Sequence, residues 1–417
     1  MAVTGPRMFP VLLVFFALLA SCSASPDVAV STSAASETTA EITTTTQPTT
    51  TTTQPTTTTT EATTTTTADP IDELVATLTL EQKAGQLLMP ILAGTDPDIG
   101  STLNERTTGF ATIREAVQNL SLGGVIYLGD NVSSAPQLTA LSAGIEEAVQ
   151  VATPGIGALI SVDQEGGRVN RVSDGVEVFP SARALSPDAD AVRAAASATA
   201  TALSDQGINI VLAPVADLTD GNAGVIGNRS YGADPEITAR MVVASVEGLQ
   251  EAGVAAAVKH WPGHGDTTLD SHSVLPTIDI DQLTWEQRER VPFAAAVEAD
   301  VAIVMVGHLA LPGLDPSGQP ATVSPVLIEE LLRADLGFEG IVMTDALDMG
   351  AVRSQDRVEL VVQSIEAGVD ILLAPPDVAL AHAAIVDAVV TGRISEERLD
   401  ASVARVLRLK DGLGLLS

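Results

Sequence analysis

Titratable side chains are concentrated in one short segment of this chain, Lys259–His272, which reads KHWPGHGDTTLDSH and holds three of the five histidines. The apolar run Val254–Val258 comes directly before it and predicts a buried strand that delivers the first two residues of the segment. A proline and two glycines then exclude a helix, so a loop carries Asp270 and His272. Titratable groups at the end of a strand and on the loop behind it indicate a functional site rather than a core.

His272 and Asp270 are separated by one residue on this loop. A carboxylate can orient a histidine and tune its pKa toward neutrality, so the pair suits a general acid and base. The alternative is a solvated surface histidine without a chemical role. Spacing alone leaves both interpretations open.

A zinc site is a further interpretation, because His260 and His264 are four residues apart, like the histidine pair of a zinc-protease helix. The Trp-Pro-Gly sequence between them breaks any helix, so the two rings need not share a face. The single cysteine, Cys22, lies in a different part of the sequence. We therefore expect no metal site and no cofactor.

Eight apolar runs of strand length recur along the chain. They are Gln86–Met89, Gly124–Leu128, Leu159–Val162, Ile208–Pro214, Val254–Lys259, Val301–Gly307, Ile341–Thr344 and Ile371–Ala374. Segments with helical spacing separate most of them, including Ala191–Gln206, Pro235–Ala252 and Arg357–Ala367, and a last helix begins after a capping Ser395 and runs to about Lys410. This alternation predicts an α/β fold with a parallel sheet covered on its faces.

Eight strands favour a (β/α)8 TIM-type barrel that forms a single catalytic domain over residues 70–417, with a doubly wound open sheet of six strands as the alternative. The first strand is the weakest part of the pattern, since 80–88 could continue as a helix. Chemistry in a barrel gathers where strands end. Charged or titratable groups follow five successive predicted strands: Asp163, Asp217, Lys259–His260, His308 and Asp345.

Each of these groups also has a structural interpretation. Asp345 suits a nucleophile or an electrostatic stabiliser, but it could equally be the N-cap of a helix. Asp163 and Arg171 could hold vicinal sugar hydroxyls, or they could form an ion pair that fixes their loop. His308 is expected to be a buried structural histidine, and Arg229, in a loop rich in turn residues, indicates nothing by itself.

The N-terminal residues predict export and anchoring. Residues 1–21 carry Arg7 and a short apolar run, as in a signal peptide, and the ending Leu-Ala-Ser-Cys resembles a bacterial lipobox. Cys22 would then be acylated, and this anchor would place the protein on the outer face of the bacterial cytoplasmic membrane. Residues 22–69, rich in Thr, Ser and Pro, predict a disordered tether.

The net charge of −32 argues against nucleic acid or an anionic membrane surface as a partner. A local cluster of basic residues is more informative against this acidic background. Because Cys22 is the only cysteine, an intrachain disulfide is excluded. The oligomeric state is not indicated.

Four segments, in this order along the chain, resemble the motifs of β-N-acetylglucosaminidases of glycoside hydrolase family 3. They are 163–171 (DQEGGRVNR), 226–232 (IGNRSYG), 259–272 and 343–347 (MTDAL). The resemblance covers nearly all of residues 70–417. It departs at Ala346, where some members carry a second acidic residue.

The resemblance implies a role for each matching residue. Asp345 would attack the anomeric carbon, and His272 with Asp270 would act as the acid and base. The remaining matches would hold a terminal N-acetylglucosamine: Asp163, Arg171, Arg229, Lys259 and His260. The implied activity is exo-acting, retaining hydrolysis of muropeptide or chitin-type fragments.

Three alternatives stay open at this point. The same site could use phosphate as the acceptor, because a histidine acid and base does not repel an anion as a carboxylate would. The protein could be a β-glucosidase-like member of the family, or a catalytically silent lipoprotein that binds glycans. The natural leaving group is not indicated.

Overall fold

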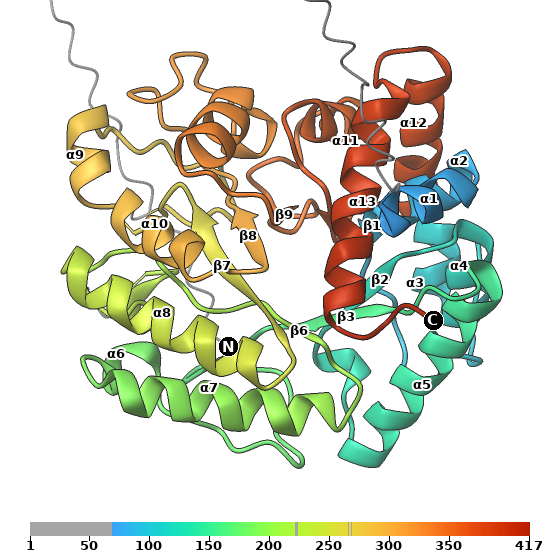
Figure 1. The fold of residues 1–417 in the computed structure, drawn as a ribbon, viewed down its shortest axis with the longest axis horizontal. Helices are drawn as coiled ribbons and strands as arrows, with labels where there is room; N and C mark the ends of the chain where they lie inside the picture. The colour runs from blue at the N-terminus through green and yellow to red at the C-terminus, as the bar shows by residue number, and fades with distance from the viewer. Residues whose placement is uncertain (1–68, 222–223, 266, 268) are drawn as a thin grey trace, which may run out of the picture. The chain divides into compact units, whose positions relative to one another are not determined.

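The computed structural model describes residues 69–221, 224–265, 267 and 269–417. The predicted signal peptide, Cys22 and the tether up to residue 68 lie outside the described residues. Figure 1 shows the strands of the described part enclosed by helices.

The strands follow the predicted runs and add one hairpin. They are β1 (Leu88–Met89), β2 (Gly124–Tyr127), β3 (Leu159–Val162), β4 (Gln164–Gly166), β5 (Val169–Asn170), β6 (Ile210–Val211), β7 (Ala255–Trp261), β8 (Ile303–Val306), β9 (Ile341–Thr344) and β10 (Leu372–Leu373). Six of them form a parallel sheet in the order β2-β3-β6-β7-β8-β9, and β1 pairs in parallel with β10. Single parallel bridges, Ile91–Ile126 and Met343–Ile371, link the segments of these two sheets, so the parallel strands follow one another in a curled arrangement.

Helices cover the outside of the strands, and Figure 1 shows α7, α8 and α10 lying along one side. The α-helices are α1 (Pro70–Thr77), α2 (Leu80–Gln86), α3 (Thr102–Thr108), α4 (Ile113–Leu120), α5 (Ala135–Ala152), α6 (Ala182–Leu185), α7 (Ala189–Ser204), α8 (Pro235–Glu251), α9 (Gln282–Gln287), α10 (Arg290–Glu298), α11 (Arg357–Glu366), α12 (Val378–Val390) and α13 (Glu396–Gly412). Short 3-10 turns η1 (Gly129–Asn131), η2 (Gly227–Arg229) and η3 (Ala321–Val323) and a π-helix, η4 (Val326–Asp335), complete the list. None of the helices in the described ranges has both the length and the apolar character of a membrane span.

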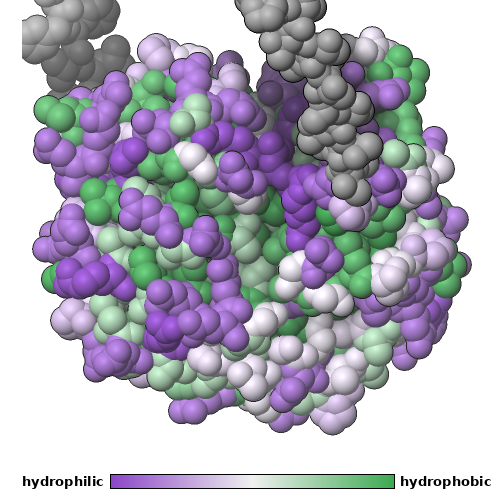
Figure 2. Space-filling view, in the orientation of Figure 1, coloured by the Kyte–Doolittle hydropathy of each residue, from purple (hydrophilic) through white to green (hydrophobic). Residues whose placement is uncertain are grey.

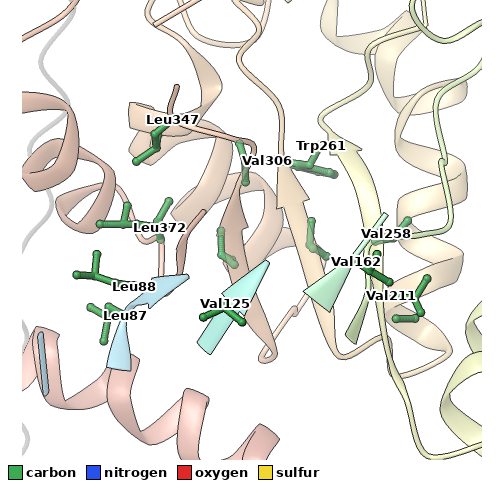
Figure 3. Close-up of a cluster of buried hydrophobic side chains, with 14 of the residues drawn as sticks. Leu87, Leu88, Val125, Val162, Val211, Val258, Trp261, Val306, Leu347 and Leu372 are labelled. Atoms are coloured by element: carbon green, nitrogen blue, oxygen red, sulfur yellow. The ribbon is translucent and has the colours of Figure 1, made fainter. Parts of the chain in front are cut away.

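Both faces of the parallel strands are buried, which explains why they read as continuous apolar runs. Along β9, Val342 joins the large cluster between strands and helices, whereas Ile341 and Met343 join a second cluster on the other side of the sheet. Figure 3 shows ten labelled members of the large cluster around the strands. On the face drawn in Figure 2, hydrophobic residues adjoin one another in the middle and hydrophilic residues lie mainly around them.

The α/β class and the predicted helices are confirmed, and the last helix is capped by Ser395, whose hydroxyl accepts a hydrogen bond from the Arg398 backbone N–H at 3.1 Å. The first predicted strand was too long. Residues up to Gln86 belong to α2, because Thr79 and Gln82 form a capping box that starts a helix there. The antiparallel hairpin of β4 and β5 was not predicted, since its residues are mostly polar.

Lys410 in α13 is fully buried, and its Nζ donates a hydrogen bond to Oε1 of Gln86 at 2.7 Å. Burial disfavours the ammonium form and lowers the pKa of Lys410 to about 7, while the charge of Glu146 opposes the shift only in part. The unfolded chain, with an ordinary lysine pKa, therefore binds more protons than the folded chain between about pH 7 and pH 10. The free energy of unfolding should rise with pH over this range and should be lowest below it.

We expect Lys410→Met to raise the free energy of unfolding at pH 7 by on the order of 3 kcal/mol and to remove the rise between pH 7 and 10. Urea unfolding of the full chain at a series of pH values measures both effects. Lys83→Met is the matched control, because Lys83 pairs with Asp400 at 2.5 Å and its side chain is partly exposed. A pH dependence in Lys410→Met equal to that of the unmutated chain would contradict the assignment of the buried charge.

Candidate active site

A cleft of about 690 Å³ opens at the carboxyl ends of the parallel strands. All eight residues that the sequence predicts for catalysis and sugar binding line it: Asp163, Arg171, Arg229, Lys259, His260, Asp270, His272 and Asp345. They come from segments up to 182 positions apart in the chain (345 − 163), so the fold brings together what the sequence separates. The edge of a parallel sheet where strands end is the expected place for such convergence.

The binding side of the cleft is built on Lys259, a buried lysine near the end of β7. Its Nζ lies 2.7 Å from Oδ1 of Asp163, which follows β3, and 2.7 Å from Oε1 of Glu165 in β4. Burial alone would lower the pKa of Lys259, but the two carboxylates raise it above the ordinary value. The ammonium group is therefore charged at neutral pH.

Glu165 is the other buried member of this network. Arg229, in η2, donates to it from Nε at 2.7 Å and from Nη2 at 2.8 Å, in a two-pronged ion pair. Burial alone would raise the pKa of Glu165, but the charges of Lys259 and Arg229 hold it well below its ordinary value. Glu165 is therefore ionised between the two cations, and the geometry of each ion pair fixes the other.

Arg171 lies at the outer edge of the same network. Its Nη2 is 3.9 Å from Oδ2 of Asp163, whereas the short contact of that aspartate is with Lys259. The alternative of an Asp–Arg pair that fixes the loop therefore holds only as a long contact. One oxygen of Asp163 and the Arg171 guanidinium face the cleft without a short bond between them.

A second buried carboxylate, Asp217, holds the histidines at the end of β7. Its Oδ2 lies 2.7 Å from Nδ1 of His260, and its Oδ1 accepts the backbone N–H groups of His260 at 3.2 Å and His264 at 2.7 Å. Burial alone would raise the pKa of Asp217, but the hydrogen bonds and charge of His260 and the contacts of His264 lower it. The imidazole of His260 is consequently fixed in one orientation at the wall of the cleft.

Asp345 follows β9 and is partly buried in the cleft. It is not a helix N-cap, because α11 begins twelve residues later and is capped by Asp356, whose side chain accepts from the backbone of Val358 and Glu359. One oxygen of Asp345 accepts the backbone N–H of Ala346 at 2.8 Å.

The protonation state of Asp345 follows from its neighbours. Burial alone would raise its pKa, but the imidazoles of His260 and His308 and the backbone N–H of Ala346 lower it. Asp345 is therefore a carboxylate at neutral pH, the form that a nucleophile requires.

Asp270 and His272 form a hydrogen-bonded pair on the loop after β7. Oδ1 of Asp270 lies 2.7 Å from Nδ1 of His272 and also accepts the backbone N–H of the histidine at 3.0 Å. Burial alone would raise the pKa of Asp270, but these two bonds lower it. The side chains are 50% and 62% exposed, so the pair stands at the mouth of the cleft with the Nε2 side of the ring left for another partner.

His308 is buried, as expected, and does not line the cleft. Its Nδ1 lies 2.6 Å from Oγ1 of Thr322 and its Nε2 lies 3.0 Å from the backbone oxygen of Ala346. Burial lowers the pKa of His308, although the charge of Asp345 opposes this. The histidine supports the segment that carries Asp345.

Among the described residues, no group of three or more His, Cys, Asp and Glu side chains is placed to hold a metal ion. His260 and His264 meet edge to face with ring centroids 5.7 Å apart, and each has a protein partner, Asp217 for the first and Ser271 for the second. Cys22 lies outside the described residues.

Two residues of the site were not assigned a role from the sequence. Glu165 lies inside the motif that contains Asp163, but nothing in that motif showed that its carboxylate pairs with Lys259 and Arg229. Asp217 was noted at the end of a predicted strand, but nothing in the spacing showed that it faces His260. The sequence pattern of one segment does not reveal which side chains of another strand it will contact.

Comparison with known proteins agrees with this geometry. Residues 79–409 match the N-terminal domain of glycosyl hydrolase family 3. The chain is 32% identical to Beta-hexosaminidase A of Pseudoalteromonas piscicida over 370 residues, which are 81% of this chain and 62% of that protein. It is 35% identical to the Beta-hexosaminidase of Stenotrophomonas maltophilia (strain R551-3) over 319 residues, which are 73% of this chain and 86% of that protein.

A solved structure of a glycoside hydrolase family 3 beta-N-acetylglucosaminidase from Paenibacillus sp. str. FPU-7 superposes with a TM-score of 0.76 at 39% identity. The match covers 81% of this chain and 63% of that one. The chain thus spans less than two thirds of that structure and of the Pseudoalteromonas protein. With a family match over most of its length and a fold and sequence shared with these relatives, the chain belongs to glycosyl hydrolase family 3.

Proposed function

We propose that the protein is an exo-acting, retaining β-N-acetylglucosaminidase. The observation that carries this proposal is the presence, in one cleft, of an ionised Asp345 and a hydrogen-bonded Asp270–His272 pair. A nucleophilic carboxylate and a separate proton donor are what double displacement at a glycosidic carbon requires. The names of the relatives support N-acetylhexosamine as the sugar.

In the first step, Asp345 attacks the anomeric carbon while His272 donates a proton to the departing oxygen. The carbon–oxygen bond breaks, the leaving group takes the proton, and the sugar becomes an ester of Asp345. Asp270 accepts the Nδ1 hydrogen of His272 and stabilises the imidazolium before the transfer, which leaves the Nε2 proton for the substrate.

In the second step, the neutral His272 takes a proton from water, which attacks the same carbon and releases Asp345. Two inversions at one carbon give net retention of configuration. A position at the mouth of the cleft suits both steps, because the leaving group departs and water enters from that side.

The sugar would be held by the ion-pair network built on Lys259 and by His260. The free oxygen of Asp163 can accept hydrogen bonds from vicinal hydroxyls, and Lys259, Arg171 and His260 can donate to sugar oxygens. Arg229 already donates three hydrogen bonds, two to Glu165 and one to the backbone oxygen of Val225. We therefore assign Arg229 chiefly to holding Glu165 in place beside Lys259.

We also infer that the parallel strands close into one (β/α)8 barrel. The pairing of β1 with β10 and the bridges Ile91–Ile126 and Met343–Ile371 support closure.

We further propose that Cys22 carries the lipid anchor and that the enzyme acts on cell-wall fragments outside the cytoplasmic membrane. The lipobox-like ending of residues 19–22 supports this placement. In a Triton X-114 extract of producing cells, the protein should partition into the detergent phase, and Cys22→Ser should move to the aqueous phase. Aqueous partitioning of the unmutated protein would contradict acylation.

The first test of the function compares chromogenic β-N-acetylglucosaminide and β-glucoside substrates. We expect turnover of the N-acetylglucosaminide, and a loss of at least about 10³-fold in kcat for Asp345→Asn, because the nucleophile is removed while the shape is kept. Proton NMR of the first-formed sugar should show the β-anomer.

Other outcomes of this test would point elsewhere. Preference for the glucoside would indicate a β-glucosidase. Formation of a sugar 1-phosphate when phosphate is added would indicate a phosphorylase. No turnover by a folded protein would indicate a glycan-binding role.

A second test addresses the proton donor. We expect His272→Ala to lower kcat/KM for N,N′-diacetylchitobiose by about 10²- to 10⁴-fold, since this leaving group needs a proton. Azide, a nucleophile that needs no base, should restore part of the turnover of an activated aryl substrate and yield a β-glycosyl azide. His382→Ala is the control, because His382 lies on α12 and does not line the cleft. Equal activity of the two variants on chitobiose would refute the assignment of His272.

A further inference from the structure

We propose that His264 and Ser271 are positioning residues, and that the hydrogen bond between them sets where the Asp270–His272 pair stands over the cleft. The inference rests on the proposed function, because it concerns the delivery of the proton by His272. Neither residue donates to the substrate in this scheme. They act through the loop that carries the acid and base.

Ser271 differs from its two neighbours in its surroundings. The residue is 2% exposed, whereas the side chains of Asp270 and His272 are 50% and 62% exposed. Successive side chains of this turn thus alternate between solvent and interior. Ser271 is the inward contact of a segment whose two functional groups face outward.

The inward contact is made with His264. Nε2 of His264 lies 2.9 Å from Oγ of Ser271, and both residues are buried. Nδ1 of the same ring makes no hydrogen bond with any described residue, so the hydrogen bonding of the imidazole is directed at Ser271. A buried polar bond of this kind is costly to break, because the partner left behind is desolvated.

His264 is itself fixed to the end of the sheet. Its backbone N–H donates to Oδ1 of the fully buried Asp217 at 2.7 Å, and Asp217 also holds the backbone and ring of His260. The path from Asp217 through His264 to Ser271 therefore connects the rigid end of β7 with the loop that returns over the cleft.

On its other side the loop is held through main-chain atoms. The backbone oxygens of Ser271 and His272 accept the N–H groups of Ala351 at 3.1 Å and Gly350 at 2.9 Å. A Cβ at Gly350 would lie 2.6 Å from the His272 oxygen, so this approach requires a glycine. The residues involved lie just after Asp345, so the segment of the nucleophile and the segment of the acid are docked on each other.

Two anchors on opposite sides define the position of a short turn, and Ser271 supplies the side-chain anchor. Without it, the turn could pivot about its main-chain bonds to residues 350 and 351. A misplacement of about 1 Å can cost on the order of 10²-fold in rate. The loss in rate should come from proton transfer to the leaving group. The positions of the sugar-binding residues, which the ion pair of Lys259 and Asp163 fixes, should not change.

The test uses two pairs of variants in the full chain. Ser271→Ala and His264→Leu remove the hydrogen bond. Ser271→Thr keeps the hydroxyl, and His264→Gln can place its amide near the position of Nε2. For each variant, kcat/KM is measured with N,N′-diacetylchitobiose, whose leaving group needs a proton, and with the 2,4-dinitrophenyl β-N-acetylglucosaminide, whose leaving group does not.

We expect Ser271→Ala and His264→Leu to lose about 10- to 100-fold in kcat/KM on chitobiose and less than about threefold on the dinitrophenyl substrate. Ser271→Thr and His264→Gln should retain most of the activity on both. If the two residues had only a structural role, kcat/KM would fall equally for both substrates and in proportion to the loss of thermal stability, which is measured on the same variants.

The inference is overturned if the folded variants Ser271→Ala and His264→Leu have the same kcat/KM on chitobiose as the unmutated chain. It is also overturned if kcat/KM falls by the same factor on both substrates. His272→Ala separates this failure from that of the proposed function. If His272→Ala shows the leaving-group dependence and the Ser271 and His264 variants do not, only the positioning role fails. If His272→Ala shows none, the acid assignment fails and the inference falls with it.

Discussion

The buried carboxylate of Asp217 is the interaction on which the geometry of the cleft depends. A desolvated charge is stable only where donors replace the lost water, and here two backbone N–H groups and one imidazole do so. Removing a donor would leave the carboxylate buried and unpaired, so the turn after β7 has little freedom to change shape. Both His260 in the binding wall and His264 beneath the acid loop take their positions from this one group.

The cleft contains a cluster of basic side chains, although the chain as a whole is strongly acidic. The protein carries a net charge of −32, yet the binding wall concentrates Lys259, Arg171 and Arg229 around two carboxylates. Each carboxylate there has a cation at 2.7 Å, and for the buried Glu165 the neighbouring cations outweigh the effect of burial and lower its pKa. The result is a set of fixed dipoles and charges that recognise hydroxyl groups without needing to reorganise when a sugar binds.

Much of the fold could be predicted from the sequence, because buried parallel strands leave continuous apolar runs. Leu159–Val162 and Ile341–Thr344 were predicted with their observed bounds. The run 208–214 was predicted as one strand, whereas regular strand β6 covers only Ile210–Val211, and beyond it single hydrogen bonds at residues 212–214 continue the contact with the neighbouring strands. Hydrophobicity reports burial, whereas strand ends are set by hydrogen bonds that a sequence does not display.

The candidate site could be predicted only through its chemistry-bearing residues. The eight residues predicted from the motifs all line the cleft, and the apolar strands before most of them indicated that they share one edge of the sheet. Partners such as Glu165 and Asp217 could not be predicted in the same way, because their importance lies in contacts between distant segments. Glu165 meets Arg229 across 64 positions of sequence. No local spacing distinguishes such a residue from an ordinary polar one.

The two halves of the proposed chemistry differ in burial, and this difference follows from what each half must do. Asp345 has to be ionised and fixed in direction, and it is held by a backbone N–H and surrounded by imidazoles within the cleft. His272 has to exchange protons with a leaving group and then with water, and its ring is 62% exposed at the mouth. An exposed acid gains access but loses the rigidity that packing gives. Ser271 resolves this conflict. It is buried between two exposed neighbours, and its hydrogen bond to His264, whose backbone is held by Asp217, fixes the backbone of the turn while the imidazole of His272 stays in contact with solvent.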